Sequence, residues 1–226
     1  MDKPVTTLFM LMSLDGKIST GATDGFDMDR DLPRIPGVRE GLHQYYDAEQ
    51  HTDLWSLNTG RVMAKIGTNT SEIPEKTPVS FAILDNSHLT EHGVHWLCAK
   101  ARELVLITSS PHHPAFCVVE ENLHVLYQEE PSLVDALAWL KTELGCERLT
   151  IQSGGTLNWA FLREKLLDYV DVVIAPMLVG GKGTPTLIDG RSLAEGDDLS
   201  ELGVLELVDC IVLEGSYLRL RYRVVS

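Results

Sequence analysis

The sequence lacks an apolar run long enough to cross a membrane. Its first apolar run, Val5 to Met12, has only eight residues and is followed at once by Ser13 and Asp15, whereas a membrane-spanning helix needs roughly 20 apolar residues. The run also lacks the small-residue cleavage site of a secretory signal. We therefore predict a buried strand here and expect no membrane partner.

Cysteines and basic residues are also scarce. The four cysteines, Cys98, Cys117, Cys146 and Cys210, are scattered without a CxxC pair, which is typical of reduced thiols and indicates a cytoplasmic protein without disulfides or a zinc site. Nineteen basic residues face thirty-three acidic ones, for a net charge of −14, so the mean field repels nucleic acid. A small anionic ligand is still possible, because a helix N-terminus can bind phosphate.

The chain does contain enough apolar material for a sizeable core. Hydrophobic residues make up 44% of its 226 residues, a length that one α/β domain can occupy, so we expect a single domain over residues 1–226. Several short apolar runs end in polar turn residues. Because these runs are continuous rather than alternating, they predict parallel strands covered on both faces. The runs lie at residues 5–12, 79–85, 103–109, 147–153 and 169–176.

Two helices are predicted from capping residues and apolar spacing. Ser132 is a good N-cap with Asp135 three residues on, and leucines follow at helical spacing until Gly145 ends the helix. A second helix is expected from Thr156 to about Leu167, with its apolar side chains on one face.

The C-terminal segment has a different periodicity. In "YLRLRYRVV", residues 217–225, apolar and arginine side chains alternate with a period of two, which predicts a half-exposed antiparallel strand. Its expected partner is "LELVDCIVL", residues 205–213, joined to it through Glu214, Gly215 and Ser216. The predicted fold is therefore α/β, with a mostly parallel central sheet flanked by helices and an antiparallel C-terminal hairpin.

A glycine pair follows one of the predicted strands. In "IQSGGTLNWAFL", Gly154 and Gly155 connect the strand that ends at Ile151 to the helix that begins near Thr156. The backbone N–H groups and the helix dipole meet at such a turn and favour an anion. The alternative is a tight turn in which glycine supplies a positive φ. Neither G-x-G-x-x-G nor the P-loop motif is present.

Two motifs together resemble a known family. "MSLDGKIST" (Met12 to Thr20) and "SGGTLNWAFLREKLLDYVDVVIAPMLVGGKG" (Ser153 to Gly183) resemble the reductase domain of riboflavin biosynthesis, a branch of the dihydrofolate-reductase-like fold. The resemblance implies that NADPH reduces the ribosyl group of a 5-phosphoribosylamino-pyrimidine to a ribityl chain, and it favours a homodimer. The deaminase motif, H-x-E with P-C-x-x-C, does not occur, so a stand-alone reductase or a paralogue is expected.

The resemblance also assigns expected roles to residues near these motifs. The cofactor's pyrophosphate would rest on the helix start, and the end of the first strand, Ser13 to Asp15, would border the nicotinamide and substrate. Asp15 is the expected polar catalytic residue, although an aspartate needs a raised pKa to donate a proton at neutral pH. The expected pyrophosphate contacts are Gly154, Gly155, Thr156, Leu157 and Asn158, and the expected substrate contacts are Ser13, Asp15, Lys17, Gln152, Gly180 and Gly181.

Several of these residues have a simpler alternative role. Asp15 and Gly16 could complete a local turn, and Lys17 could bind phosphate or only support that turn. Gln152 stands where the family usually has glutamate, and an amide can orient a hydroxyl but cannot act as a base. The Gly/Pro-rich segment from Pro176 to Gly190 could close over a ligand or only connect two strands.

Two further segments are candidates for the cofactor. Thr59, Gly60 and Arg61 follow an apolar run and could face the nucleotide, or Thr59 could simply cap a helix. Thr108 and Ser109, with His112 nearby, could hold the 2′-phosphate of NADPH, or form an ordinary Ser/Pro turn.

The histidines do not suggest a metal site. His112 and His113 are neighbours on a loop and point apart, and His92 and His95 fit a solvated helix face better than a shared ion; the same holds for His88. We therefore expect no bound metal.

Three functions stay open on the sequence. The first is the riboflavin-pathway reductase. The second is a dihydrofolate-type or general NADPH reductase, which would need a buried carboxylate such as Glu40, Asp47 or Glu49. The third is a non-catalytic nucleotide sensor, which Gln152 and the unusual stretch "DGFDMD", Asp24 to Asp29, keep open because many family members have a Ser-x-Trp pair there.

Overall fold

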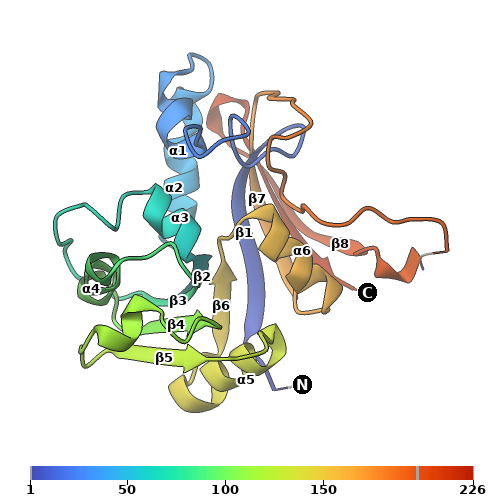
Figure 1. Ribbon diagram of the computed structural model, residues 1–226. Helices are drawn as coiled ribbons and strands as arrows, with labels where there is room; N and C mark the ends of the chain where they lie inside the picture. The colour runs from blue at the N-terminus through green and yellow to red at the C-terminus, as the bar shows by residue number, and fades with distance from the viewer. Residues whose placement is uncertain (1, 197–198, 226) are drawn as a thin grey trace. The chain divides into compact units, whose positions relative to one another are not determined.

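A computed structural model of the chain describes residues 2–196 and 199–225. Its contacts divide the chain into two compact units, Met1–Val5 with Asp53–Ser153 and Thr6–Thr52 with Gly154–Ser226. Strands and helices alternate along the chain in both units (Figure 1). The expectation of one domain over residues 1–226 stays a prediction, and each unit is described by itself.

The first unit contains five parallel strands in the order β5-β4-β3-β2-β6. The runs at 79–85, 103–109 and 147–153 form β3, β4 and β6, which confirms the predicted parallel strands. Strand β2 contains the apolar run noted before Gly60, and β5 was not predicted. The strands are β2 (Trp55–Thr59), β3 (Ser80–Leu84), β4 (Leu104–Thr108), β5 (Leu123–Tyr127) and β6 (Arg148–Ile151).

Three α-helices belong to this unit, α3 (Gly60–Lys65), α4 (Glu91–Lys100) and α5 (Leu133–Leu144), and a 3-10 turn covers Pro114–Cys117. Helix α5 has the predicted ends: the Asp135 amide donates to Ser132 Oγ at 3.1 Å, and Gly145 ends the helix with φ 63°. One core cluster packs α4 on the sheet, and it includes Val94, Leu97, Ile83 and Leu106.

The second unit contains β1 (Val5–Ser13), β7 (Tyr169–Ala175), β8 (Leu205–Val212) and β9 (Leu218–Val224), in the order β1-β7-β9-β8. Strands β1 and β7 are parallel, and β9 runs antiparallel to both β7 and β8. The C-terminal hairpin is therefore confirmed. The chain is an α/β protein with mostly parallel strand pairing, as predicted.

Helices α1 (Met28–Asp31), α2 (His43–Glu49) and α6 (Gly155–Arg163) complete this unit, with 3-10 turns at Leu32–Arg34, Arg39–Gly41, Leu199–Glu201 and Glu214–Ser216. Phe9 and Leu11 of β1 share a core cluster with Leu42 and Tyr45. The rings of Phe9 and Tyr45 stack with centroids 5.3 Å apart.

Helix α6 is shorter than predicted. It ends at Arg163 rather than near Leu167, because Lys165 takes a left-handed conformation with φ 55°. Leu166 and Leu167 are nonetheless buried. Their apolar spacing therefore reports burial correctly, but not continued helix.

No helix in the described parts of the chain is long and apolar enough to span a membrane.

Candidate cofactor and substrate site

Gly154 precedes the first residue of α6 and is open on its side-chain face. Its φ is −72° and its ψ is 158°, values that any L-residue can adopt. A Cβ built on Gly154 would meet no heavy atom within 4 Å. The alternative of a positive-φ turn is therefore wrong, and no neighbouring group among the described residues explains the missing side chain.

Gly155 has a structural explanation. A Cβ at this position would lie 2.3 Å from the carbonyl oxygen of Thr186 and 2.6 Å from Oδ2 of Asp189. The Asp189 amide also donates to the Gly155 carbonyl at 2.9 Å. Gly155 is thus required where the segment around Thr186–Asp189 contacts the start of α6.

The first amides of α6 are available for a ligand. Among the described residues, the N–H groups of Gly155 and Thr156 have no hydrogen-bond partner, and no side chain caps the helix. The amides of Leu157 and Asn158 already donate to the Gly154 carbonyl, at 3.0 and 3.1 Å. Two adjacent donors therefore lie at the positive end of a nine-residue helix.

Asn158 does not have the expected environment of a cofactor contact. Its side chain is completely buried, and Nδ2 donates to the Leu187 carbonyl at 2.8 Å. The structure gives Asn158 the role of joining α6 to the loop before Gly190, which corrects the expectation from sequence. Leu157 likewise offers no free amide.

Asp15, after β1, holds the neighbouring loop. Its Oδ1 accepts from the Ser13 hydroxyl at 2.5 Å and from the Val179 amide at 3.0 Å, and its Oδ2 accepts from the Gly180 amide at 2.6 Å. The bond from Ser13 and then those from Val179 and Gly180 lower the pKa of Asp15 to about 2. Asp15 is therefore ionised at neutral pH, which argues against the proton-donor role considered for it from sequence.

Lys17 binds two carbonyl groups of the same loop. Its Nζ donates to the carbonyls of Gly181 and Thr184, each at 2.9 Å. Gly180 and Gly181 have φ values of 72° and 79°, so both glycines are explained by left-handed backbone. The segment expected to close over a ligand is thus anchored by Asp15 and Lys17.

The loop continues to the start of α6. The Ile18 amide donates to the Pro185 carbonyl and the Leu187 amide to the Gly16 carbonyl, each at 3.0 Å. Together with the contact between Asp189 and Gly155, these bonds join the end of β1 and the start of α6 through one segment. Beside them, Leu14 and Leu178 are 64% and 72% exposed, an apolar surface next to polar backbone.

The first unit contains the other candidate residues. Thr59 caps α3, because its Oγ1 accepts from the Val62 amide at 3.4 Å, so the helix-capping alternative is confirmed. Arg61 lies on the exposed side of α3. Gln152, after β6, accepts a hydrogen bond from the Ser56 hydroxyl at 3.0 Å.

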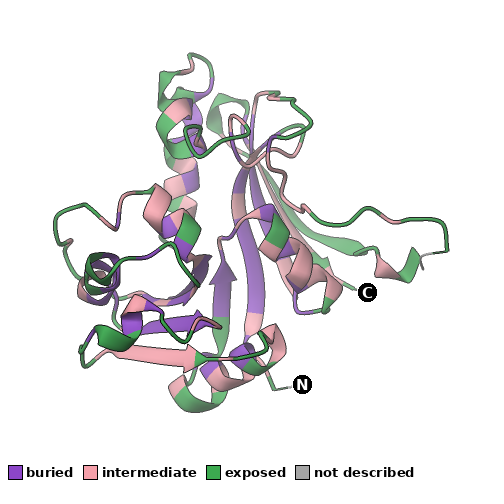
Figure 2. Cartoon of the chain, viewed as in Figure 1, coloured by how far each residue is buried: buried purple, intermediate pink, exposed green. Residues whose placement is uncertain are grey.

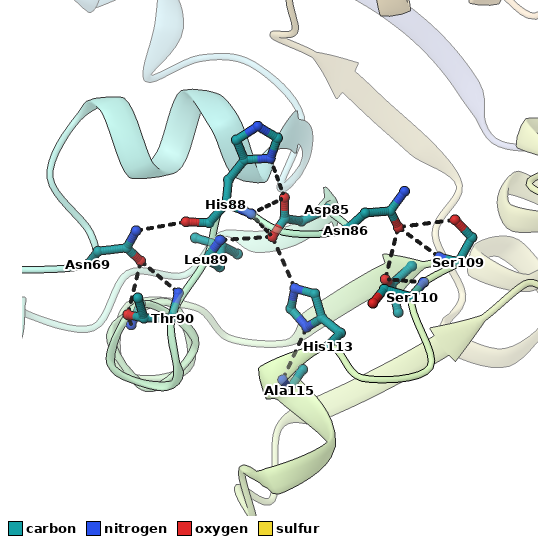
Figure 3. Close-up of polar contacts among 12 residues, drawn as sticks. Asn69, Asp85, Asn86, His88, Leu89, Thr90, Ser109, Ser110, His113 and Ala115 are labelled. Carbon is teal, nitrogen blue, oxygen red and sulfur yellow. Dashed lines mark hydrogen bonds and ion pairs between the residues drawn. The ribbon is translucent and has the colours of Figure 1, made fainter.

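Thr108 and Ser109 contact Asn86, in the turn after β3, and Figure 3 shows Ser109 beside this asparagine. The Thr108 hydroxyl, the Ser109 amide and the Ser109 hydroxyl all donate to Oδ1 of Asn86, at 3.0, 2.9 and 3.2 Å. Both hydroxyls are therefore engaged with Asn86 rather than free for a phosphate.

A buried carboxylate that was not predicted from the sequence, Asp85, lies beside this cluster (Figure 3). Asp85 Oδ2 accepts from Nε2 of His113 at 3.0 Å and from the Leu89 amide at 2.9 Å, and Oδ1 accepts from Nδ1 of His88 at 2.8 Å. Burial raises the pKa of Asp85, but the hydrogen bonds, first that from His113, outweigh burial and hold it well below its ordinary value. A Cβ on Gly60 would lie 2.2 Å from the Asp85 carboxyl carbon, which explains that glycine.

The protonation of His113 follows from its two partners. Its Nδ1 accepts from the Ala115 amide at 3.1 Å, so the ring proton lies on Nε2, which donates to Asp85. The available signal in the sequence was an acidic residue at the end of a buried run. Its histidine partner is 28 positions away and could not be inferred from spacing.

The other histidines make separate contacts. His92 pairs with the Ser71 carbonyl and His95 with Glu120, each at 2.9 Å. Within residues 2–196 and 199–225, no group of three or more His, Cys, Asp or Glu side chains could hold a metal ion.

The parallel strands and the open helix start after a glycine turn are typical of α/β proteins that bind nucleotides. The fold is that of the dihydrofolate-reductase-like proteins: dihydrofolate reductase from Enterococcus faecalis superposes with a TM-score of 0.52 at 14% identity, covering 98% of this chain and 97% of that one. Within this class, the model of the RibD C-terminal domain matches residues 4–212. The chain belongs to this family.

Named relatives agree with this assignment. The chain is 30% identical over 212 residues to the 2,5-diamino-6-ribosylamino-4(3H)-pyrimidinone 5′-phosphate reductase of Methanothermobacter thermautotrophicus, covering 88% of this chain and 90% of that protein. It is 25% identical to the protein of the same name from Archaeoglobus fulgidus, covering 84% and 88%. Acinetobacter baumannii RibD superposes with a TM-score of 0.68 at 17% identity, covering 99% of this chain but only 59% of that longer chain.

Proposed function

We propose that this protein is an NADPH-dependent reductase that converts the ribosyl group of 2,5-diamino-6-ribosylamino-4(3H)-pyrimidinone 5′-phosphate to a ribityl chain. The observation that carries the proposal is the start of α6, where Gly154 is open and the amides of Gly155 and Thr156 are free. The curated relatives that carry the name of this reductase support the choice of substrate.

The helix start has the chemistry that a dinucleotide requires. The N–H groups of Gly155 and Thr156 would donate to the pyrophosphate, and the absence of a side chain on Gly154 leaves room for its oxygens. When bound, the nicotinamide supplies the hydride. The chain's own contribution is alignment, because the segment from Pro176 to Gly190 is bonded both to Asp15 after β1 and to Gly155 at the start of α6.

The substrate is proposed to lie beside the end of β1. Leu14 and Leu178 expose apolar side chains that suit a flat ring. The Lys17 ammonium donates to two carbonyls, and its third N–H can still donate to a phosphate. Asp15, ionised and bound to the loop, keeps this surface in place, and we assign it no proton transfer.

The dihydrofolate-type alternative needs a buried carboxylate, and the expected segment offers none. Glu40 and Asp47 are exposed and Glu49 is only half-buried. The sensor alternative makes a different prediction, namely that NADPH binds but is not oxidised.

Stopped-flow measurement of NADPH oxidation with the pyrimidine substrate or dihydrofolate separates these functions. We expect oxidation with the pyrimidine and none with dihydrofolate. Gly154→Val should abolish NADPH binding, because a branched side chain would occupy the place of the pyrophosphate, and Gly154→Ala should weaken it less. Thermal unfolding of both variants should match wild type, since nothing lies within 4 Å of this position. Unchanged NADPH affinity in Gly154→Val would refute the assignment.

We also propose a homodimer formed through the C-terminal hairpin. All eight residues of β8 are exposed, in contrast to the buried β1 and β4 (Figure 2). The strand register places apolar side chains together on one face of the hairpin, exposed on β8 and half-buried on β9. Exposed apolar surface of this kind marks protein interfaces. This apolar face consists of Leu205, Leu207, Cys210 and Val212 on β8 and Leu218, Leu220, Tyr222 and Val224 on β9.

The apolar face gives a direct test of the dimer. Leu207→Glu should give a monomer in size-exclusion chromatography with light scattering. Ile211→Glu is the control, because Ile211 pairs with Arg219 on the opposite face and should leave the dimer intact. A dimer that survives Leu207→Glu would exclude this surface.

A cytoplasmic location is part of the proposal. All four cysteines are free thiols, and burial raises the pKa of both Cys98 and Cys146 to about 12. Such thiols are inert, structural groups, as in reducing compartments.

A further inference from the structure

Lys182 lies in a tight turn of the segment between β7 and β8. The Thr184 amide donates to the Gly181 carbonyl at 3.3 Å, which closes a four-residue turn with Lys182 and Gly183 at its two central positions. Gly181 has a left-handed φ of 79°, and a Cβ there would lie 2.5 Å from Oγ1 of Thr184. The backbone that carries Lys182 therefore has a defined shape.

This turn is bonded to the residues that follow β1. Two carbonyls of the turn, those of Gly181 and Thr184, accept from Nζ of Lys17, each at 2.9 Å. Just before the turn, two backbone amides donate to the Asp15 carboxylate. All of these contacts lie within the second unit, so the turn lies beside the end of β1, where the substrate is proposed to bind.

Asp15 and Lys17 together supply little net charge for a phosphate. Asp15 is ionised, because its hydrogen bonds, first that from Ser13, lower its pKa to about 2, and its negative charge offsets the positive charge of Lys17. Lys17 also uses two of its three N–H groups on the loop. A phosphate dianion at this place therefore needs a further cation.

The loop provides such a cation in Lys182. Its side chain is exposed, and no hydrogen bond or ion pair joins it to another residue in the part of the chain that the structure describes. Arginines of β9 in the same unit differ from it, because Arg219 pairs with Asp171 and Arg223 with Glu206. In a chain with a net charge of −14, an unpaired ammonium group gives this loop a local attraction for an anion.

We propose that Lys182 binds the 5′-phosphate of the pyrimidine substrate and gives the enzyme its selectivity for a phosphorylated substrate. Lys17 supports this role by holding the turn that carries Lys182. The inference rests on the proposed function, in which the ring of the same substrate lies on Leu14 and Leu178. Leu178 precedes Lys182 by four residues on the same anchored loop, so one extended ligand can contact both side chains.

Steady-state kinetics of Lys182→Gln with two forms of the substrate test this role. The two forms are 2,5-diamino-6-ribosylamino-4(3H)-pyrimidinone with and without its 5′-phosphate, each measured at saturating NADPH. With the phosphorylated form, we expect KM to rise about tenfold, the effect of losing one charge-assisted hydrogen bond. The kcat should stay unchanged, because a phosphate far from the reacting carbon is bound equally in the ground state and the transition state. With the unphosphorylated form, the variant should match wild type.

Three controls accompany this substitution. Lys182→Arg keeps the charge and should restore most of the affinity. Lys165→Gln removes the same charge elsewhere in the second unit, because the Lys165 side chain is also exposed and unpaired among the described residues but follows the C-terminal end of α6; it should leave KM unchanged. In Lys182→Gln, hydrogen exchange at the Val179 and Gly180 amides should match wild type, since the loop keeps its bonds to Asp15.

The outcomes separate this inference from the proposed function. If wild type oxidises NADPH, three results in Lys182→Gln would each overturn the inference and leave the proposed function standing. These are an unchanged KM for the phosphorylated form, an equal rise in KM for both forms, and a fall in kcat alone. Wild-type protein that oxidises NADPH with neither form would overturn the proposed function and this inference with it.

Discussion

Asp15 and Asp85 both follow a strand with a parallel neighbour, but Asp15 stabilises a loop at the surface and Asp85 stabilises a polar cluster in the interior. Asp15 is exposed and holds the amides of Val179 and Gly180 from outside, whereas Asp85 is buried and bound to His113. Hydrogen bonds lower the pKa of both carboxyl groups. The same residue type at the same place in a β-α unit therefore organises a loop in one case and a buried polar core in the other.

The largest expected effect is a difference in the free energy of unfolding between variants of the two carboxylates. Asp85→Asn should lower the free energy of unfolding by about 3 kcal/mol or more, because an amide cannot accept all the bonds from His113, His88 and Leu89 in a buried place. Urea denaturation measures this. Asp15→Asn is the matched change at an exposed carboxylate and should leave the midpoint near that of wild type; equal losses in both variants would remove the distinction.

A smaller loss is expected where the loop held by Asp15 reaches α6. Gly155→Ala should cost about 1 to 3 kcal/mol, because the new Cβ would lie 2.3 Å from the Thr186 carbonyl oxygen. Gly154→Ala adds the same atom one residue earlier into open space and should leave the unfolding midpoint unchanged. If the two alanine variants unfold alike, the two glycines do not have the different roles described here.

The pH dependence of stability should follow the buried carboxylate. Both aspartates have folded-state pKa values below 3.8, so their stabilising effect is present above the unfolded-state pKa and is lost as the pH falls through the lower folded-state values. The free energy of unfolding should therefore decrease below about pH 4. Asp85→Asn should have the shallower slope, and an equally steep slope in that variant would contradict the role given to Asp85.

The smallest expected effect is local and concerns Asp15. Asp15→Asn replaces one of the two oxygens that accept from Val179 and Gly180, so these two amides should exchange hydrogen faster at neutral pH. Amides in α5 serve as the internal reference. Unchanged protection at both loop positions would mean that Asp15 does not hold the loop.

Much of the fold could be predicted from local patterns. Continuous apolar runs gave the parallel strands, Ser132 and Gly145 gave the ends of α5, and alternation gave the C-terminal hairpin. Strand β5 was missed because it is only half-buried and forms no continuous buried run. The end of α6 was misplaced because Leu166 and Leu167 keep helical spacing after the helix has stopped.

The candidate site was less predictable, because the role of each of its residues depends on contacts between segments that are distant in the sequence. The glycine turn could be found from its position between a strand and a helix. The separate roles of Gly154 and Gly155 could not, because they depend on where Thr186 and Asp189 lie. The partners of Asp85 were likewise invisible, because His113 lies 28 positions away along the chain.

A crystal structure of the protein soaked with NADPH tests the central claim most directly. We expect pyrophosphate oxygens within hydrogen-bond distance of the Gly155 and Thr156 amides, with the open face of Gly154 against them. Density for the dinucleotide at another place, or both amides bonded to protein atoms with NADPH at saturating concentration, would contradict it.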